Sequence, residues 1–185
     1  MTLRSVTAVV PFVLLLFPAT LLLAGSTPPP SATAVPGTDG YVTIPKAELR
    51  PNKSQHYRAI FNATEAAGRP TEVVPALNMA GSELNALAAE NVPLSNARFV
   101  VVFHGAAIDA ILDDAHYKAK YGVDNPNLSV LAAMRKAGTE IFVCGQNMLA
   151  VAMDPKSISP DVRVASDALL VLMAYQNKGY ALLDF

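Results

Sequence analysis

Hydrophobic residues follow two patterns from about residue 57 to the end of the sequence. The segment at 57–63 alternates and contains aromatic residues, which suits a strand. Apolar runs typical of buried strands occupy 97–103 and 139–143. Between them, apolar residues recur every three or four positions, which is the spacing of one helical face. Shorter strands are expected at 162–164 and 180–185. Strands that alternate with helices indicate parallel βαβ units, so the sequence predicts an α/β fold: a three-layer α/β/α sandwich with a mostly parallel sheet of about five strands.

Turn residues mark where the predicted helices begin. Asn125 is placed to cap a helix whose first residue is Pro126, and Ser166 is placed to cap the last helix. Such turns matter because a parallel fold presents its ligand chemistry beyond the carboxyl ends of its strands. The other helices are expected after Pro75, across 108–115 and, as a short one, across 147–153.

Residues 1–26 have the pattern of an export signal. They combine one basic residue, Arg4, with a nearly unbroken apolar stretch, and they end in the small residues Ala24 and Ser26. We therefore expect cleavage after Ser26 and a periplasmic or otherwise exported protein with no stable membrane insertion. An uncleaved membrane anchor is the alternative, because about 20 apolar residues can span a bilayer. Prolines within the stretch favour cleavage.

Residues 27–55 differ in composition from both neighbouring segments. Pro, Ser, Thr, Ala and Gly dominate 27–40, which predicts an extended tether. Short apolar pieces broken by Pro45 and Pro51 follow and predict an irregular arm. The folded domain is accordingly expected to cover 56–185.

Composition and charge narrow the classes of function. The 14 Lys and Arg residues against 15 Asp and Glu residues leave a formal net charge of −1, which argues against a nucleic-acid-binding protein. A single cysteine excludes an intrachain disulfide and any metal site made of several thiolates. The hydrophobic fraction of 52% is high for a soluble protein, and the apolar leader accounts for much of it. We expect no metal and no cofactor.

The lone cysteine follows a buried strand. Cys144 ends the strand at 139–143 and precedes Gly145 and Gln146. A thiol near a helix N-terminus favours the reactive thiolate, and Gly145 would let backbone N–H groups approach an anion or a persulfide. The alternative is a buried cysteine that only fills space.

A histidine occupies the corresponding position after another strand. His104 follows the strand at 97–103 and precedes Gly105. Because parallel strands end at one edge of the sheet, His104 and Cys144 should share that edge, with His104 as base or anion partner. A histidine that only satisfies a hydrogen bond is the alternative. The candidate catalytic residues are therefore Cys144 and His104, and the candidate ligand-binding residues are Gly105, Gly145, Gln146 and Asn125.

Acidic residues near one histidine raise the question of a metal site. Residues three or four apart share a helical face, and this spacing relates Asp109, Asp113, Asp114 and His116. No second histidine lies close in sequence, so a solvated helix face is favoured over a metal site.

Four motifs follow one another along the folded part of the sequence: ARFVVVFHG (97–105), YGVDNPN (121–127), EIFVCGQ (140–146) and QNKGYAL (176–182). Taken in order, they resemble the exported branch of the DsrE/DsrF-like family. The resemblance covers about 56–185 and implies a parallel α/β/α fold and assembly into trimers or hexamers. The best-known relatives bind or relay sulfur through a cysteine persulfide in sulfur oxidation and transfer-RNA thiolation. Cys144 matches the family's strand-end cysteine, whereas the resemblance implies no established role for His104.

Two functional hypotheses follow. In the first, Cys144 carries a persulfide or accepts sulfane sulfur from a donor, with His104 and the Cys-Gly-Gln backbone stabilising the anion. In the second, the protein is a non-catalytic homo-oligomer that binds a small ligand or partner, and Cys144 is structural. An oligomer would also cover Leu182, Leu183 and Phe185. The sulfur-relay relatives are cytoplasmic, so an exported chain cannot join their relays and their substrates are not transferred to it.

Overall fold

The computed structural model describes residues 33–185. The predicted export signal lies outside the described residues, as does the first part of the predicted tether. In the part of the chain that is described, no helix is both long and apolar enough to traverse a membrane.

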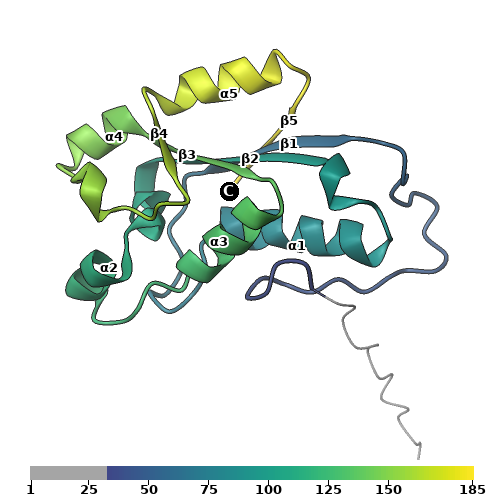
Figure 1. Ribbon diagram of the computed structural model, residues 1–185, viewed down its shortest axis with the longest axis horizontal. Coiled ribbons are helices and arrows are strands. Elements are labelled where there is room, and N and C mark those ends of the chain that lie inside the picture. The colour runs from purple at the N-terminus through teal and green to yellow at the C-terminus, as the bar shows by residue number, and fades with distance from the viewer. Residues whose placement is uncertain (1–32) are drawn as a thin grey trace, which may run out of the picture.

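The described strands form one parallel sheet of five, in the order β4-β3-β2-β1-β5 (Figure 1). Every pairing between neighbours is parallel. The predicted strands at 57–63 and 97–103 coincide with β1 and β2, and the predicted α/β fold is confirmed. The strands are β1 (Tyr57–Ala63), β2 (Ala97–Phe103), β3 (Glu140–Cys144), β4 (Arg163–Ala165) and β5 (Ala181–Asp184).

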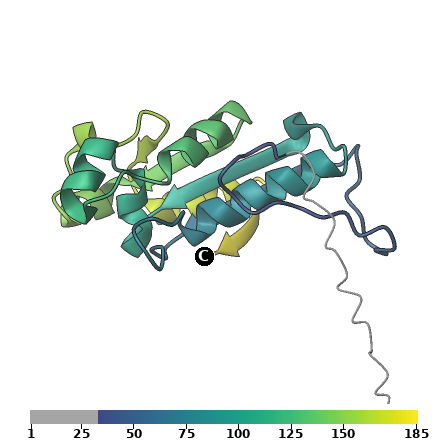
Figure 2. The same cartoon turned by 90° about the horizontal axis from the view of Figure 1, so that it is seen from below.

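Helices cover both faces of the sheet, which makes the three layers (Figures 1 and 2). α1 (Pro75–Ala89) and α3 (Leu128–Lys136) lie on one face, and α5 (Ala168–Gln176) lies on the other. Alternate strand residues enter two separate cores, because successive side chains point to opposite faces. The larger core lies under α1 and α3, and the smaller one lies under α5. The remaining helices are α2 (Asp114–Tyr121), α4 (Gly145–Ala150) and three 3₁₀ helices, η1 (Leu94–Asn96), η2 (Gly105–Ile111) and η3 (Pro155–Ser157).

The segment after β2 differs from the single helix predicted across 108–115. The chain first forms η2 and then begins α2, with Asp113 as the N-cap. The Asp113 carboxylate accepts a hydrogen bond of 2.8 Å from the backbone N–H of His116. A good cap residue in the middle of the apolar pattern therefore starts a new helix.

Two other helix starts lie one or two residues later than predicted. Asp167, and not Ser166, caps α5, and its carboxylate accepts from two N–H groups of the first turn. The helix expected to start at Pro126 begins at Leu128. Adjacent short polar residues all favour the cap position, so tertiary contacts decide which of them occupies it.

The predicted tether packs against the domain in its described part. Val35 is fully buried, and its N–H donates to Asn85 Oδ1 of α1 at 2.8 Å. Thr38 fills the space beside Gly81, where a Cβ would lie 2.5 Å from Thr38 Cγ2. The prediction of an extended tether is therefore wrong for 33–38, because one valine with satisfied backbone hydrogen bonds docks on α1. Residues 40–56 contain no helix or strand.

Candidate functional site

The register of β2 and β3 brings His104 and Cys144 side by side. Phe103 pairs with Val143, so the next residues along the two strands are His104 and Cys144. Cys144 belongs to the core under α5. His104 continues β2 with extended backbone (φ −160°, ψ −177°), so its side chain lies on the same face. The prediction that both residues share one edge of the sheet is confirmed.

A chain of hydrogen bonds continues from His104 across β1 to β5. His104 Nε2 lies 2.8 Å from Asn62 Oδ1, and Asn62 Nδ2 donates to Asp184 Oδ1 at 2.8 Å. Asn62 and Asp184 are paired in the register of β1 and β5. The carboxyl edge therefore carries Cys144, His104, Asn62 and Asp184 on four neighbouring strands, all facing the α5 side.

Asn62 and Asp184 were missed by sequence reasoning. Each is a polar residue near the carboxyl end of its strand, after apolar neighbours, and this was the signal available. Their proximity depends on β1 pairing with β5, which joins residues 122 positions apart.

Cys144 is buried in apolar surroundings. Its exposed fraction is 5%, and it shares the core under α5 with Val102, Ala168 and Leu172. Among the described residues, no hydrogen bond joins its sulfur to His104. The neighbouring imidazole is the group that can accept the thiol proton and balance the resulting charge.

The two predicted glycines have different local roles. Gly105 adopts a left-handed conformation (φ +61°) that turns the chain sharply out of β2 into η2. At Gly145, a Cβ would lie 2.7 Å from the carbonyl oxygen of Ala165. Ala165 pairs with Cys144 in the register of β3 and β4. Gly145 therefore allows β4 to pack closely beside the cysteine, and the space next to it is filled by a carbonyl oxygen.

A small cavity lies between α4 and β4. Its volume is about 330 Å³, and Gln146, which is exposed, contributes to its wall with Leu149 and Val164. Cys144 itself does not line the cavity. Gln146 is therefore close to Cys144 in sequence, but its side chain belongs to a separate, mostly apolar surface.

Asn125 has a structural environment. Its Nδ2 donates to the carbonyls of Ala110 (3.0 Å) and Leu112 (2.6 Å), and its Oδ1 accepts from the backbone and side-chain amides of Asn127 (both 2.9 Å). The side-chain amide is buried and fully used within the chain. The structure thus separates Asn125 from the carboxyl-edge residues, and it holds the turn before α3.

The acidic residues considered for a metal site have other partners. Asp109 accepts hydrogen bonds of 2.6 Å from Lys120 Nζ and from the Tyr121 hydroxyl. Hydrogen bonds from the backbone and then the ring of His116 lower the pKa of the Asp113 carboxyl. Within residues 33–185, no cluster of three or more His, Cys, Asp or Glu residues could hold a metal ion.

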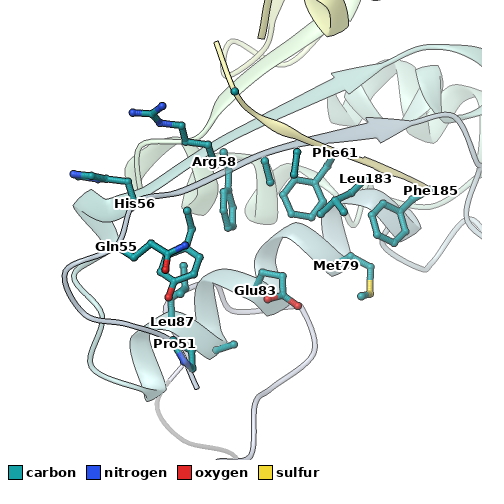
Figure 3. Close-up of a pocket in the computed structure, with 16 residues that line it drawn as sticks. Pro51, Gln55, His56, Arg58, Phe61, Met79, Glu83, Leu87, Leu183 and Phe185 are labelled. Carbon is teal, nitrogen blue, oxygen red and sulfur yellow. The ribbon is translucent and has the colours of Figure 1, made fainter. Parts of the chain in front are cut away.

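A larger groove lies on the opposite face of the sheet, between α1 and strands β1 and β5 (Figure 3). Its volume is about 810 Å³, and Phe61, Leu183 and Phe185 form much of its apolar wall. Glu83 of α1 lies beside them. The groove shares no lining residue with the carboxyl-edge chain, so its apolar surface is a separate feature of the molecule.

These features define a small parallel α/β protein with a thiol and an imidazole side by side at the carboxyl edge. The model of the DsrE/DsrF-like family matches residues 56–185, and the chain belongs to that family. A solved structure with a similar fold is that of a protein of unknown function, MTH1491, from Methanobacterium thermoautotrophicum. The TM-score is 0.51 and the sequence identity 19%, over 70% of this chain and 99% of that chain. No curated protein matches the sequence.

Proposed function

We propose that the protein binds or relays sulfane sulfur, with Cys144 as the persulfide-carrying residue and His104 as its base. The observation that carries the proposal is the position of the two residues on neighbouring strands, at one edge and on one face. Membership of the DsrE/DsrF-like family supports the same chemistry.

The chemical step requires only a thiol and a sulfane-sulfur donor. The thiol proton of Cys144 passes to the imidazole, and the thiolate attacks a sulfane sulfur of a polysulfide. A bond forms between the Cys144 sulfur and that atom. The S–S bond of the donor breaks, and the shortened polysulfide leaves with the electron pair. Sulfur atoms and electrons balance between Cys144 and the donor, so no further oxidant is needed.

Burial restricts the class of donor. With an exposed fraction of 5%, the sulfur of Cys144 is accessible to a small inorganic donor, such as polysulfide or thiosulfate, more readily than to a protein cysteine. Transfer to a second protein would require α5, whose Ala168 and Leu172 pack against Cys144, to move away. The proposal therefore names a small donor for the loading step.

Mass spectrometry of the intact protein tests this proposal. Incubation with polysulfide should add about 32 Da for each sulfur atom, and a thiol reductant should remove the addition. The sequence contains one cysteine, so Cys144→Ser should abolish the addition completely. His104→Gln should slow it. Absence of any adduct on the wild-type protein, with all small donors tested, would overturn the proposal.

A second candidate function is a non-catalytic homo-oligomer in which Cys144 is structural. The observation that favours it is an exposed apolar surface, which we call the α5 patch. Thermal stability and cellular phenotype that are both unchanged in Cys144→Ser would favour this candidate. A strong phenotype with unchanged stability would favour sulfur handling. The α5 patch comprises Leu169, Leu170 and Met173 of α5, each more than half exposed.

We propose in addition that residues 1–26 direct export and are removed. The support is the basic start, apolar stretch and small-residue exit of the sequence. The sulfur donor and acceptor would then be found outside the cytoplasm. N-terminal sequencing of the mature protein tests this, since cleavage after Ser26 gives a new terminus at Thr27. An intact Met1 terminus would show that the segment is retained.

A further inference from the structure

The α5-facing side of the sheet changes from apolar to polar at its carboxyl edge. Along β1 the residues on this face are Arg58, Ile60 and Asn62, and along β5 they are Leu182 and Asp184. Asn62 is half-buried and its backbone carbonyl accepts from the N–H of Phe185 at 3.0 Å. The pairing of β1 with β5 therefore fixes the position from which the Asn62 side chain reaches both neighbours.

The hydrogen-bonding capacity of each group fixes which atom donates and which accepts in this series of hydrogen bonds. A carboxylate only accepts hydrogen bonds, so the group that Asn62 presents to Asp184 must be its NH₂. This turns Oδ1 of Asn62 toward His104. An amide oxygen also only accepts, so Nε2 of His104 must carry the hydrogen. In the neutral ring, Nδ1 is then left as the basic nitrogen.

We propose that Asn62 and Asp184 are positioning residues that hold His104 as the Nε2–H tautomer, so that Nδ1 is the base available to Cys144. The inference deepens the proposed function and rests on it only in naming Cys144 as the proton donor. The thiol proton moves to Nδ1, which leaves a thiolate and an imidazolium. The imidazolium keeps its Nε2–H bond to Asn62, and the carboxylate of Asp184 polarises that amide and stabilises the positive charge.

Two acidic residues that follow strand ends, Glu65 after β1 and Asp167 after β4, stand outside this chain of hydrogen bonds. Glu65 follows β1, and its backbone N–H bonds to the Phe185 carbonyl oxygen at 3.2 Å. Asp167 precedes α5 and its carboxylate is used in capping that helix. Among the described residues, the hydrogen bond made by the His104 ring is the one to Asn62 Oδ1.

Imidazole nitrogen spectra of the whole protein test the inference directly. Long-range ¹H–¹⁵N correlation at a pH where the ring is neutral distinguishes the two tautomers, and His104→Gln assigns the signal among the three histidines. We expect the Nε2–H tautomer in the wild-type protein and a mixture of tautomers in Asn62→Ala. An Nδ1–H tautomer in the wild type, or an unchanged tautomer in Asn62→Ala, would overturn the inference.

A swap of the two side chains separates positioning from simple packing. Asn62→Asp combined with Asp184→Asn places an acceptor at position 62 and a donor at position 184, so the chain of hydrogen bonds can form again. The double substitution should restore the Nε2–H tautomer, which Asp184→Asn alone should weaken. Asp124→Asn is the matched control, because Asp124 is exposed, is paired with Lys118 and takes no part in the hydrogen bonds from His104 to Asp184. It should leave the tautomer unchanged.

The rate at which iodoacetamide alkylates Cys144 in the folded protein is the second measurement. Asn62→Ala should lower this rate about tenfold, less than the complete loss of a general base, and the swap should restore it. Failure of sulfur loading with the expected tautomers would remove the proposed function and leave the positioning role. Normal sulfur loading of the wild type, together with a His104 tautomer that does not change in Asn62→Ala, would remove the positioning role and leave the proposed function. If Asn62→Ala does not fold, Asp184→Asn and the swap provide the same comparison.

Discussion

Asn125 makes four hydrogen bonds through a single buried side-chain amide. Asn125→Ala leaves two carbonyls and one backbone N–H of this turn without these partners, and buried groups without partners are costly. We expect the free energy of unfolding to fall by about 2–4 kcal/mol, measured by urea denaturation. Asn177→Ala is the control, because Asn177 is exposed at the end of α5. Unchanged stability with lost ligand binding would instead support the predicted ligand-binding role.

Gly145 is needed for the close approach of β4 to the residue after Cys144. In Gly145→Ala the new Cβ would meet the Ala165 carbonyl at 2.7 Å, and backbone cannot yield as a flexible side chain can. The free energy of unfolding should fall by about 1–3 kcal/mol. Chemical denaturation measures this against Gly68→Ala, where the added Cβ would meet only the end of the Glu72 side chain at 3.3 Å. If Gly145→Ala kept its stability and lost sulfur loading alone, Gly145 would serve the anion as the sequence predicted.

At the scale of elements, Glu90 at the C-terminal end of α1 binds the irregular arm, residues 41–55. Arg50 and the Tyr41 hydroxyl bond to its carboxylate, which is nearly buried. The hydrogen bond from Arg50 lowers the pKa of Glu90, against the opposing effect of burial. Since the pKa is lower in the folded protein, this contribution to stability is present above the unfolded pKa of about 4.3 and is lost as the pH falls below it.

Thermal unfolding across pH tests the role of Glu90. Glu90→Gln should have a lower melting temperature than the wild type at pH 7, and the difference should shrink below about pH 4, where the wild-type carboxylate is also neutralised. Glu48→Gln is the matched control, because Glu48 lies exposed on the same arm. A difference between Glu90→Gln and wild type that is constant from pH 7 to pH 3 would contradict the assigned contribution.

The sequence predicted the strands better than it predicted the helix starts or the hydrogen bonds that join His104, Asn62 and Asp184. A strand covered on both faces needs a continuous apolar run, so 97–103 identified β2 without knowledge of its neighbours. Helix starts depend on which of several adjacent polar residues is free to cap, as at Asp167. The chain from His104 to Asp184 depends on strand order, and strand order is a property of the whole sheet.

At the scale of the molecule, α5 links the candidate site to a surface that suits a second copy. The helix is apolar on its inner side, where Ala168 and Leu172 cover Cys144, and also on its outer side, where Leu169, Leu170 and Met173 are exposed. A helix that is apolar all round is normally buried. A homo-oligomer that covers the α5 patch would give α5 the environment its sequence requires and would place a subunit contact directly above the cysteine.

Substitution of the α5 patch tests this assembly. Leu169 and Met173 lie four residues apart on one side of α5, and both are more than half exposed, so Leu169→Gln with Met173→Gln should leave the fold intact. Each buried apolar side chain contributes about 1.5–3 kcal/mol, so the pair should weaken association at least about tenfold. Size-exclusion chromatography with light scattering should show an oligomer for the wild type and a shift toward monomer for the variant. Leu49→Gln, at a leucine 93% exposed on the arm, should keep the wild-type mass. A monomeric wild type, or an unchanged mass in the double variant, would exclude the α5 patch as the subunit interface.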